Sequence, residues 1–544
     1  MTLLDWFVIV LYLGGIIAFA VIRGRSQVNV QDYYLANRGI RWWESGASTM
    51  ATQLGAISFV SAPAFVAIKE GGGLKWLAYE FGVPLGLLLV MMVILPILHR
   101  GNHISIYEYL EQRFDRGTRT LVSILFQLGR GLATAVSVLA GGIIISTALP
   151  VSTVEAIIIV GVVTVIYDAL GGIRVVILSD FLQMIVIALG ILICGGAALW
   201  LVGWEAAWQA LSPERFRILD FERWGLTPEG EYAFWPMAIG GFFLYASYYG
   251  CDQSQVQREL TVGNLRDVRR SLLVNVFGRF PMVLLYCVMG VLGGAVFTSP
   301  DLLGQLASAL DLDAAGVTES LQRDPDRMVP MFILAFLPPG VVGLIFVAIL
   351  SALMSSLDSG INSLSAATMQ DIYRVHIKRE ASDRHYLIAS KITTLFWGAF
   401  CVVAAIAFAQ AGEGIRQTSI VLINAVGSLL YGPILAAFLL GMVARYVTAF
   451  EIKAGIVTGI FANIALWQLT TVSWLWWNFV GFAVTLAVTG ILWLVQMGRT
   501  VPPALDEHVH YSAKSLRISP RIAGSVITYF FVIVLISFFI QQTR

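Results

Sequence analysis

Residues 50–63 read MATQLGAISFVSAP and lie inside an apolar run that extends over residues 45–68. Small and polar side chains occupy the middle of this run, and Pro63 removes a backbone hydrogen-bond donor. A membrane helix of this composition can break and present free backbone carbonyls. The same residue types are also typical of close packing between membrane helices, so both interpretations stay open at this point.

The composition of the whole chain excludes an ordinary soluble protein. Hydrophobic residues make up 58% of the 544 residues and charged residues only 13%, against about 25% charged in a soluble domain. The apolar residues form runs of about 20, long enough for a helix to cross the hydrocarbon core of a bilayer. The net charge of +1 gives no indication of nucleic-acid binding. We therefore expect an all-α integral membrane protein that contacts the lipid bilayer and no nucleic acid.

About 14 apolar runs are predicted to span the membrane. They cover residues 4–22, 45–68, 74–98, 120–149, 152–171, 177–202, 235–255, 271–297, 329–357, 388–410, 417–443, 449–470, 473–497 and 521–540. Lys and Arg concentrate in alternate loops, so the positive-inside rule predicts that both termini are extracytoplasmic. We expect a multi-pass protein of the cell membrane, and the compact chain favours a bacterial inner membrane.

A second interrupted run covers residues 235–255, where Gly240 and Gly241 are followed by the polar stretch YYGCDQ at residues 248–253. Two polar interruptions five spans apart are typical of transporters built from two inverted repeats of five helices, in which they are the first helices of the two halves. We therefore predict a core of five plus five helices, with one helix before it and three after it.

This interpretation divides the chain into five consecutive parts. They are a first transmembrane helix with a cytoplasmic linker (1–44), the first repeat (45–202), an extracellular loop (203–234), the second repeat with a further extracellular loop at 298–328 (235–445), and peripheral C-terminal helices (446–544).

The ninth run contains the sequence SALMSSLDSGINS at residues 351–363. On a helix, Ser355, Asp358, Ser359 and Asn362 stand at i, i+3, i+4 and i+7, which aligns their oxygen atoms along one face. Hard cations prefer oxygen ligands. Packing between helices can also use hydroxyl groups, but it does not require a carboxylate in their midst. Cation binding is therefore favoured, and one carboxylate among neutral oxygens suits Na⁺ better than Ca²⁺.

A charged side chain inside the membrane is costly unless it is paired, and six residues are candidates for such buried charges. Asp180, Asp252 and Arg279 are expected near the ends of their spans, where an interfacial role is as plausible as a functional one. Glu80, Arg130 and Asp358 lie deeper, and the first two form either a structural ion pair or part of a polar solute pocket. The six residues are Glu80, Arg130, Asp180, Asp252, Arg279 and Asp358.

The chain resembles the sodium/solute symporter family, which includes sodium-coupled transporters of glucose, proline and sialic acid. The resemblance rests on motifs that occur in order along nearly the whole chain: DYYLA at 32–36, YEYLEQRFD at 107–115, GGIR at 171–174 with SDFLQ at 179–183, DQ at 252–253 with VQR at 256–258, and SS at 355–356 through DIY at 371–373. It implies the fold of five plus five helices, Na⁺ as the coupling ion and no other cofactor.

The resemblance also implies two cation sites. Matching positions give the backbone carbonyls of Ala51 and Leu54, the carbonyl of Ala352 and the hydroxyls of Ser355 and Ser356 as sodium ligands.

A second cation site in some family members matches Asp180, Asp358 and Ser359, but here Asp358 stands where those members have a hydroxyl. This carboxylate could bind a second Na⁺, accept a proton or pair with a neighbouring cation.

Positions that contact the solute in the family match Gln53, Ser58, Glu80, Arg130 and Tyr248. The position of Arg130 holds a carboxylate in a sialic acid transporter, whereas the position of Glu80 binds hydroxyls in a galactose transporter. If Arg130 pairs with Glu80, the pocket is nearly neutral and suits a sugar or polyol. If Arg130 is free, an organic acid or sugar acid would supply its counter-charge.

These observations predict sodium-coupled symport of a small polar solute by alternating access, with a sugar, polyol or sugar acid favoured and with no obligatory protein partner. A monocarboxylate or amino acid is the alternative solute, and a channel or solute sensor on the same fold is the alternative function. The inner segments 371–391 and 499–520 are too short for a signalling domain. The six His residues lie outside the predicted spans and no phosphate-binding loop is present, so we expect no enzyme activity.

Overall fold

The computed structural model describes residues 1–24, 27, 29–101, 103–148, 151–410, 419–496 and 518–543. These residues form helices and one isolated β-bridge, between Ile40 and Val262, so the expected all-α class is confirmed. Within the described ranges, 11 helices are long and apolar enough to cross a membrane, or up to 12 if one bent pair is a single span. The number of 14 spans stays a prediction, and most of the expected inner segment 499–520 lies outside the described residues.

The first half of the chain starts with one long helix and continues through several shorter ones. These elements are α1 (Leu3–Gly24), α2 (Val30–Leu35), η1 (Ala36–Arg38), α3 (Trp42–Gln53), α4 (Ala56–Ala67), α5 (Trp76–Tyr79), α6 (Gly82–Leu89), η2 (Val90–Ile94), α7 (Leu95–Arg100), α8 (Glu108–Arg113), α9 (Arg116–Ala148), α10 (Thr153–Val202), α11 (Trp204–Ala210), η3 (Pro213–Phe216) and η4 (Pro228–Gly230).

The second half repeats the alternation of long and interrupted helices. Its elements are η5 (Pro236–Gly240), α12 (Gly241–Cys251), α13 (Gln253–Leu260), α14 (Leu265–Thr298), α15 (Pro300–Ala309), α16 (Ala314–Arg323), η6 (Pro325–Arg327), α17 (Met328–Phe336), α18 (Val341–Ala367), η7 (Thr368–Ile377), α19 (Asp383–Gln410), α20 (Ser419–Val443), α21 (Ala449–Leu469), α22 (Trp474–Gln496) and α23 (Pro520–Gln542).

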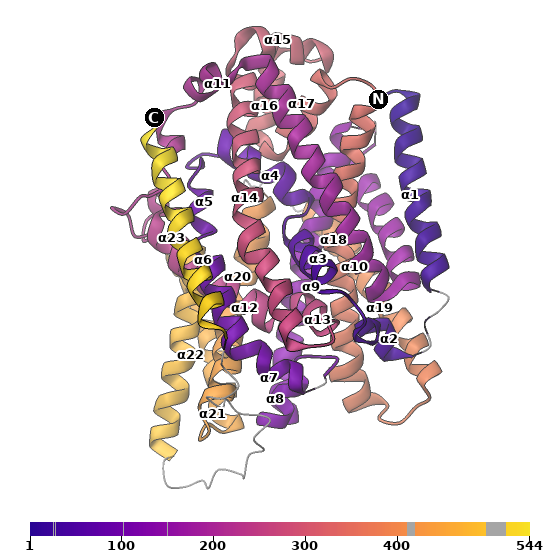
Figure 1. Cartoon of the computed structure of the whole chain (residues 1–544), viewed down its shortest axis with the longest axis vertical. Helices are drawn as coiled ribbons and strands as arrows, with labels where there is room; N and C mark the ends of the chain where they lie inside the picture. The colour runs from indigo at the N-terminus through magenta and orange to yellow at the C-terminus, as the bar shows by residue number, and fades with distance from the viewer. Residues whose placement is uncertain are drawn as a thin grey trace.

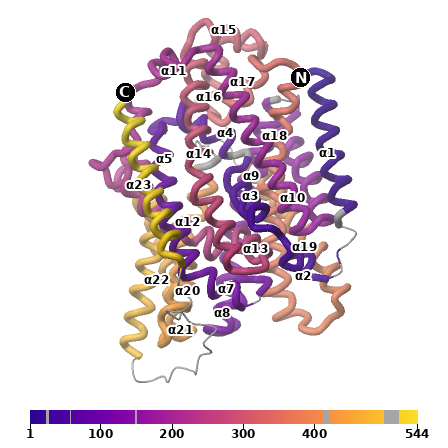
Figure 2. The backbone as a smooth tube through the Cα atoms, viewed as in Figure 1, coloured from indigo at the N-terminus to yellow at the C-terminus, as the bar shows by residue number. Residues whose placement is uncertain are grey.

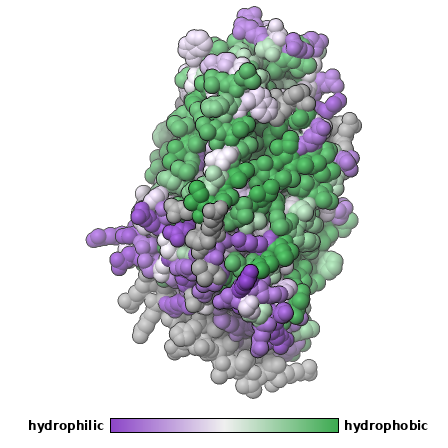
Figure 3. Space-filling model, turned by 90° about the vertical axis from the view of Figure 1, so that its right-hand side faces the viewer, coloured by the Kyte–Doolittle hydropathy of each residue, from purple (hydrophilic) through white to green (hydrophobic). Residues whose placement is uncertain are grey.

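The helices run mostly along the long axis of the molecule, with α3, α4, α9 and α18 near its centre (Figure 1). The start of α1 and the end of α23 lie at the same end, together with α11 and α15, whereas α2 and α8 lie at the opposite end (Figure 2). Figure 3 shows that hydrophobic side chains cover much of the middle of one face, and that hydrophilic side chains gather toward the ends. This distribution is the one expected of a protein with a lipid-facing belt.

The stretch at residues 50–63 is interrupted as its composition indicates. Helix α3 ends at Gln53, α4 begins at Ala56, and the two helices are bent by 47° relative to each other. Leu54 leaves helical geometry with φ −95° and ψ 42°, and Gly55 is extended. A Cβ atom at Gly55 would lie only 3.0 Å from the carbonyl oxygen of Ala352, so the missing side chain lets the break approach α18 closely.

The second interruption falls between α12 and α13, at Asp252, whose backbone is extended with φ −98° and ψ 121°. The Asp252 carboxylate caps α13 by accepting a hydrogen bond from the Ser254 amide at 2.8 Å. Every residue of α13 is buried. Both predicted interruptions are therefore present, although the relation of the two halves as inverted repeats stays a prediction.

The predicted break between residues 171 and 177 is present as a kink within the continuous element α10 (Thr153–Val202). Gly172 there has a non-helical φ of 62° and ψ of −177°, so two helices meet at this residue. The predicted span at residues 329–357 is wrong in its boundaries, because α17 ends at Phe336 and α18 begins only at Val341. Proline cannot donate the hydrogen bonds that continue a helix, and the sequence LPPG at residues 337–340 separates the two helices.

Candidate functional site

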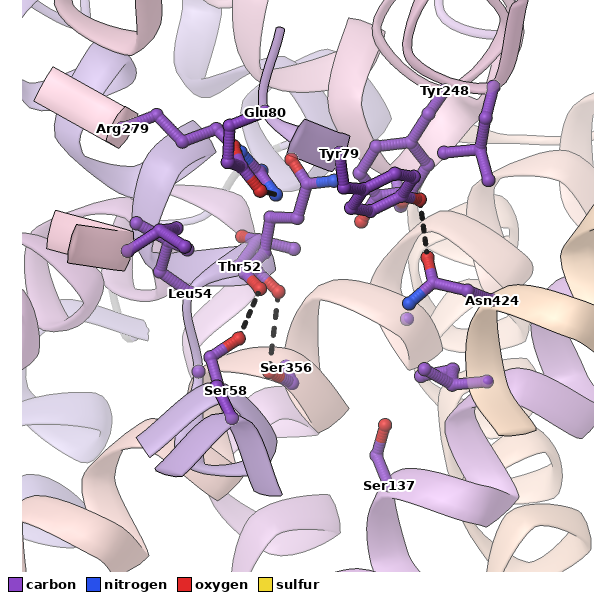
Figure 4. Close-up of a pocket in the computed structure, with 18 of the residues that line it drawn as sticks. Thr52, Leu54, Ser58, Tyr79, Glu80, Ser137, Tyr248, Arg279, Ser356 and Asn424 are labelled. Atoms are coloured by element: carbon purple, nitrogen blue, oxygen red, sulfur yellow. Dashed lines mark hydrogen bonds and ion pairs between the residues drawn. The ribbon is translucent and has the colours of Figure 1, made fainter. Parts of the chain in front are cut away.

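A central cavity lies beside the break between α3 and α4 (Figure 4). Its wall combines residues of α3, α4, α9, α12, α14, α18 and α20, so it joins segments that are far apart in the sequence. All five residues predicted to contact the solute line this central cavity, namely Gln53, Ser58, Glu80, Arg130 and Tyr248. Aromatic side chains complete much of the wall: Trp76, Tyr79, Tyr248, Tyr286 and Tyr431.

The predicted sodium ligands of α18 face the break directly. The Ser355 hydroxyl lies 3.5 Å from the carbonyl oxygen of Ala51 and 3.4 Å from that of Ala352, to which it donates. The Ser356 hydroxyl donates to the carbonyl oxygens of Thr52 and Ala352, each at 3.3 Å. Four of the five predicted ligands, together with Thr52, thus form one cluster of uncharged oxygen atoms, a donor set that fits a small hard cation.

Leu54, the fifth predicted sodium ligand, lies at the break itself and is buried. Its carbonyl oxygen accepts a hydrogen bond from the Tyr286 hydroxyl at 3.1 Å. A carbonyl oxygen has two lone pairs, so this hydrogen bond leaves one for a further partner. Tyr286 therefore fixes the orientation of the Leu54 carbonyl group, a contact that the sequence did not predict.

The three residues of the predicted second cation site have different partners. The Asp180 carboxylate accepts hydrogen bonds from the Ser48 hydroxyl at 2.5 Å and from Arg258 at 3.3 Å. Ser359 also contacts Arg258, and its hydroxyl lies 3.2 Å from that of Thr52.

Asp358 lies on the same helix but turns toward α10, where it accepts a hydrogen bond from the Tyr167 hydroxyl. Ser359 donates a second hydrogen bond to it at 3.2 Å. Among the described residues, no Lys, Arg or His forms an ion pair with Asp358. Arg258, which contacts the neighbouring Ser359, pairs with Asp180.

The two charged residues predicted deepest in the cavity wall do not pair with each other. Glu80 pairs with Arg279 and also accepts a hydrogen bond from the Tyr245 hydroxyl at 3.1 Å. Arg130 pairs with Asp252. Neither alternative for Arg130, a pair with Glu80 or a free guanidinium, describes the structure. The partner of Arg130, Asp252, lies at the end of α12 as expected, whereas the partner of Glu80, Arg279, lies within α14 and lines the cavity.

Sequence reasoning missed several polar residues that shape this region. The Tyr79 hydroxyl donates a hydrogen bond to the side chain of Asn424 at 3.1 Å, and both residues line the central cavity (Figure 4). Asp168, which is fully buried in α10, accepts a hydrogen bond from Asn362 at 3.4 Å. A polar residue inside an apolar run was the available signal for Asn424 and Asp168, because such residues rarely face lipid.

The fold is shared with a solved structure, that of a sodium-coupled sialic acid symporter in a substrate-bound, outward-open state. The superposition has a TM-score of 0.79 at 23% sequence identity and covers 92% of this chain and 99% of the other. The long apolar helices and the cavity at the interrupted span define a multi-pass membrane protein with a polar central cavity.

The chain belongs to the sodium:solute symporter family, whose sequence model matches residues 33–459. This family consists of sodium-coupled transporters rather than enzymes, and its coupling ion is Na⁺. The expected family and its implied coupling ion are thereby confirmed.

Relatives of known activity are about equally distant from this chain. The sodium/sialic acid symporter NanT of Aliivibrio fischeri is 26% identical over 88% of this chain and 90% of its own length. The sodium/glucose cotransporter of Vibrio parahaemolyticus is 26% identical over 81% of this chain and 79% of its own. The human sodium/iodide cotransporter is 26% identical over 81% of this chain, which spans just under two thirds (65%) of that relative.

Proposed function

We propose that this protein couples the inward movement of Na⁺ to the uptake of a small polar organic solute by alternating access. One observation carries the proposal: the hydroxyls of Ser355 and Ser356 lie within 3.3–3.5 Å of the backbone carbonyls at the break between α3 and α4, beside a polar cavity. A cation bound there would join α18 to the broken span, because its ligands come from both.

The proposed sodium site consists of Ala51, Leu54, Ala352, Ser355 and Ser356. The hydroxyl hydrogens that now point at carbonyl oxygens would turn away, so that hydroxyl and carbonyl oxygens face the ion together. Asp180, Asp358 and Ser359 are proposed to hold a second cation, either Na⁺ or a proton. Each positive charge that moves inward gains about 2.3 kcal/mol per 100 mV of membrane potential, so a second cation would steepen accumulation.

The proposed solute site consists of Gln53, Ser58, Glu80, Arg130 and Tyr248, and the favoured solutes are sugars, polyols and sugar acids. Family relatives described as transporters of sialic acid and glucose support this class. A relative described as a sodium-coupled monocarboxylate transporter keeps that solute class as the alternative.

The proposed architecture is the predicted one: about 14 spans around a core of two inverted five-helix repeats. It divides at residues 1–44, 45–202, 203–234, 235–445 and 446–544, and both termini are proposed to face outside a bacterial inner membrane. The common end at which α1 begins and α23 ends supports an even number of spans (Figure 1). Accessibility of single cysteines placed at residues 2 and 543 to a membrane-impermeant reagent on intact cells would test the orientation.

The test of function is uptake into proteoliposomes that contain the purified protein, with an inward gradient of Na⁺ or of K⁺. The solutes are labelled sugars, polyols, sugar acids, amino acids and monocarboxylates. Accumulation of a solute in the Na⁺ gradient alone is the expected result. Equal accumulation in both gradients would exclude sodium coupling, and a sustained Na⁺ current without any solute would favour the channel alternative.

A further inference from the structure

Two ion pairs set the fixed charge of the central cavity. Glu80 and Arg279 form the first pair, and both side chains are buried. The Glu80 carboxylate accepts two hydrogen bonds from Arg279 and one from the Tyr245 hydroxyl, which itself accepts a hydrogen bond from Arg279 at 2.7 Å. These contacts satisfy the carboxylate, and Figure 4 shows Glu80 and Arg279 directed toward each other at one side of the cavity. This pair adds no net charge to the site.

Arg130 and Asp252 form the second pair. One Asp252 oxygen contacts Arg130, while the other accepts hydrogen bonds from the Ser254 amide at 2.8 Å and the Ser254 hydroxyl at 2.6 Å. The carboxylate is therefore fixed at the start of α13 rather than free to swing away. The ring of Tyr248 packs over the guanidinium at 4.9 Å, which holds Arg130 from the other side.

Asp252 does not line the central cavity. It lines a second, smaller cavity whose wall also includes Arg130 and Tyr431, so Arg130 stands between the two spaces. A solute in the central cavity would touch the guanidinium of Arg130 but not the carboxylate that neutralises it. Asp252 can thus act on solute selection through Arg130 rather than by touching the solute itself.

The paired charges disfavour an anionic solute. A carboxylate in the central cavity would meet two guanidinium groups whose counter-charges are already in place, and it would add an unbalanced negative charge to a site of low dielectric constant. It could bind Arg130 fully only by displacing Asp252, which would leave a buried carboxylate without a partner.

The polar groups of the cavity wall that have no hydrogen-bond partner are complementary to hydroxyl groups of a solute. The side-chain oxygen of Gln53 and the Nε–H of Arg130 have no hydrogen-bond partner among the described residues. The first needs a donor and the second needs an acceptor. A hydroxyl group supplies both, whereas an ionised carboxylate only accepts.

From these contacts we infer that Asp252 is a specificity-determining residue: by neutralising Arg130, it makes the central cavity select uncharged, hydroxyl-bearing solutes over carboxylates. This inference rests on the proposed solute site and narrows the solutes proposed for it.

The test compares solutes that differ in little more than a carboxylate. The pairs are glucose with glucuronate, galactose with galacturonate, and lactamide with lactate, and the readout is thermal stabilisation of the purified full chain in NaCl and in KCl. The neutral member of a pair is expected to stabilise the wild-type protein at a concentration at least about tenfold lower than the acidic member needs. This ratio corresponds to a difference of ~1.4 kcal/mol in binding free energy. In Asp252→Asn, which releases the Arg130 charge, this preference is expected to fall at least about tenfold or to reverse.

The Asp252→Asn substitution keeps an oxygen that can cap α13, since Asn is as good an N-cap residue as Asp. The double variant with Arg130→Gln and Asp252→Asn removes both charges and controls for general damage, because it is expected to retain a preference for the neutral member. A purely structural role of Asp252 would weaken the binding of both members of a pair alike. Only a role in selection would change the ratio between their stabilising concentrations.

The outcomes separate this inference from the proposed function. A wild-type protein stabilised by the acid member in preference, or an unchanged ratio in Asp252→Asn, would overturn the role of Asp252 even if the effect required Na⁺. A neutral solute that stabilises equally in NaCl and KCl would instead contradict sodium coupling and leave the charge selection standing.

Discussion

The two interrupted helices are stabilised at their breaks by different chemical groups. At the first break, between α3 and α4, Leu54 and Gly55 carry no charge, and the nearby carbonyl groups face serine hydroxyls of α18. At the second break, between α12 and α13, Asp252 caps the new helix and pairs with Arg130. The first break therefore offers neutral oxygen atoms to an ion, whereas the second uses a fixed charge to position another side chain.

This difference predicts that the two breaks fail in different ways when they are altered. Damage to the charged break should reduce stability, because it leaves a buried charge without a partner. Damage to the neutral break should reduce the apparent affinity for Na⁺ while the protein remains folded. The predictions below separate these effects, beginning with the largest.

The largest effect is expected for Asp252→Ala at the charged break. This change removes the α13 cap and leaves Arg130 buried without its counter-charge, and breaking a buried pair costs about 3–5 kcal/mol. The measurement is the free energy of unfolding of the purified protein. Asp267→Ala is the matched control, because it breaks an exposed pair with Arg270 (2.9 Å) and should lower the free energy of unfolding far less. Equal losses in the two variants would show that burial of the second break contributes little.

At the neutral break, Gly55→Ala is expected to raise the Na⁺ concentration for half-maximal uptake severalfold to about a hundredfold, since overpacking typically costs ~1–3 kcal/mol. The added Cβ atom would press against Ala352 and Ser356 of α18 and separate the two sets of proposed sodium ligands. Gly14→Ala in α1 is the matched control, because a Cβ atom there has no neighbour within 4 Å. An unchanged sodium dependence in Gly55→Ala would remove this contact from the proposed site.

A smaller effect is expected when single hydroxyl groups are removed from α18. Ser355→Ala and Ser356→Ala should each raise the Na⁺ concentration for half-maximal uptake about fivefold, the equivalent of roughly 1 kcal/mol for one polar contact. Ser363→Ala is the control on the same helix, because its hydroxyl donates to the Gly360 carbonyl of its own helix. If Ser363→Ala changes the sodium dependence as much as the other two, the effect belongs to the helix and not to the ligands.

The sequence predicted the neutral break better than the charged one, and the reason is the range of the interactions involved. Small and polar residues within residues 50–63 already indicate where a helix can break, and the spacing of Ser355, Asp358 and Ser359 already assigns them to one helix face. Both features depend on residues close in sequence. The expected partners of an ion bound there followed from the family resemblance.

Charge pairing could not be predicted in the same way, because it depends on how distant helices pack. Arg130 and Asp252 are 122 positions apart, and Glu80 and Arg279 are 199 apart. The sequence showed that these four residues fall within apolar runs, but not which of them meet. In contrast, the boundary between α17 and α18 was available from residues 337–340, where two prolines and a glycine interrupt the apolar run.

The smallest and most specific effect is expected from Asp358→Ser, which replaces the carboxylate with a hydroxyl group. Asp358 bonds to Tyr167 and Ser359, on the same helix as the ligands of the neutral break. A hydroxyl can replace the carboxylate as a hydrogen-bond acceptor without carrying a charge, so the variant should fold and should keep solute-dependent uptake. If Asp358 binds a second cation, the variant should move about one elementary charge fewer per solute molecule in reconstituted vesicles. Uptake should then depend less steeply on the membrane potential. An unchanged ratio would make Asp358 a structural partner of Tyr167 and confine coupling to the neutral break.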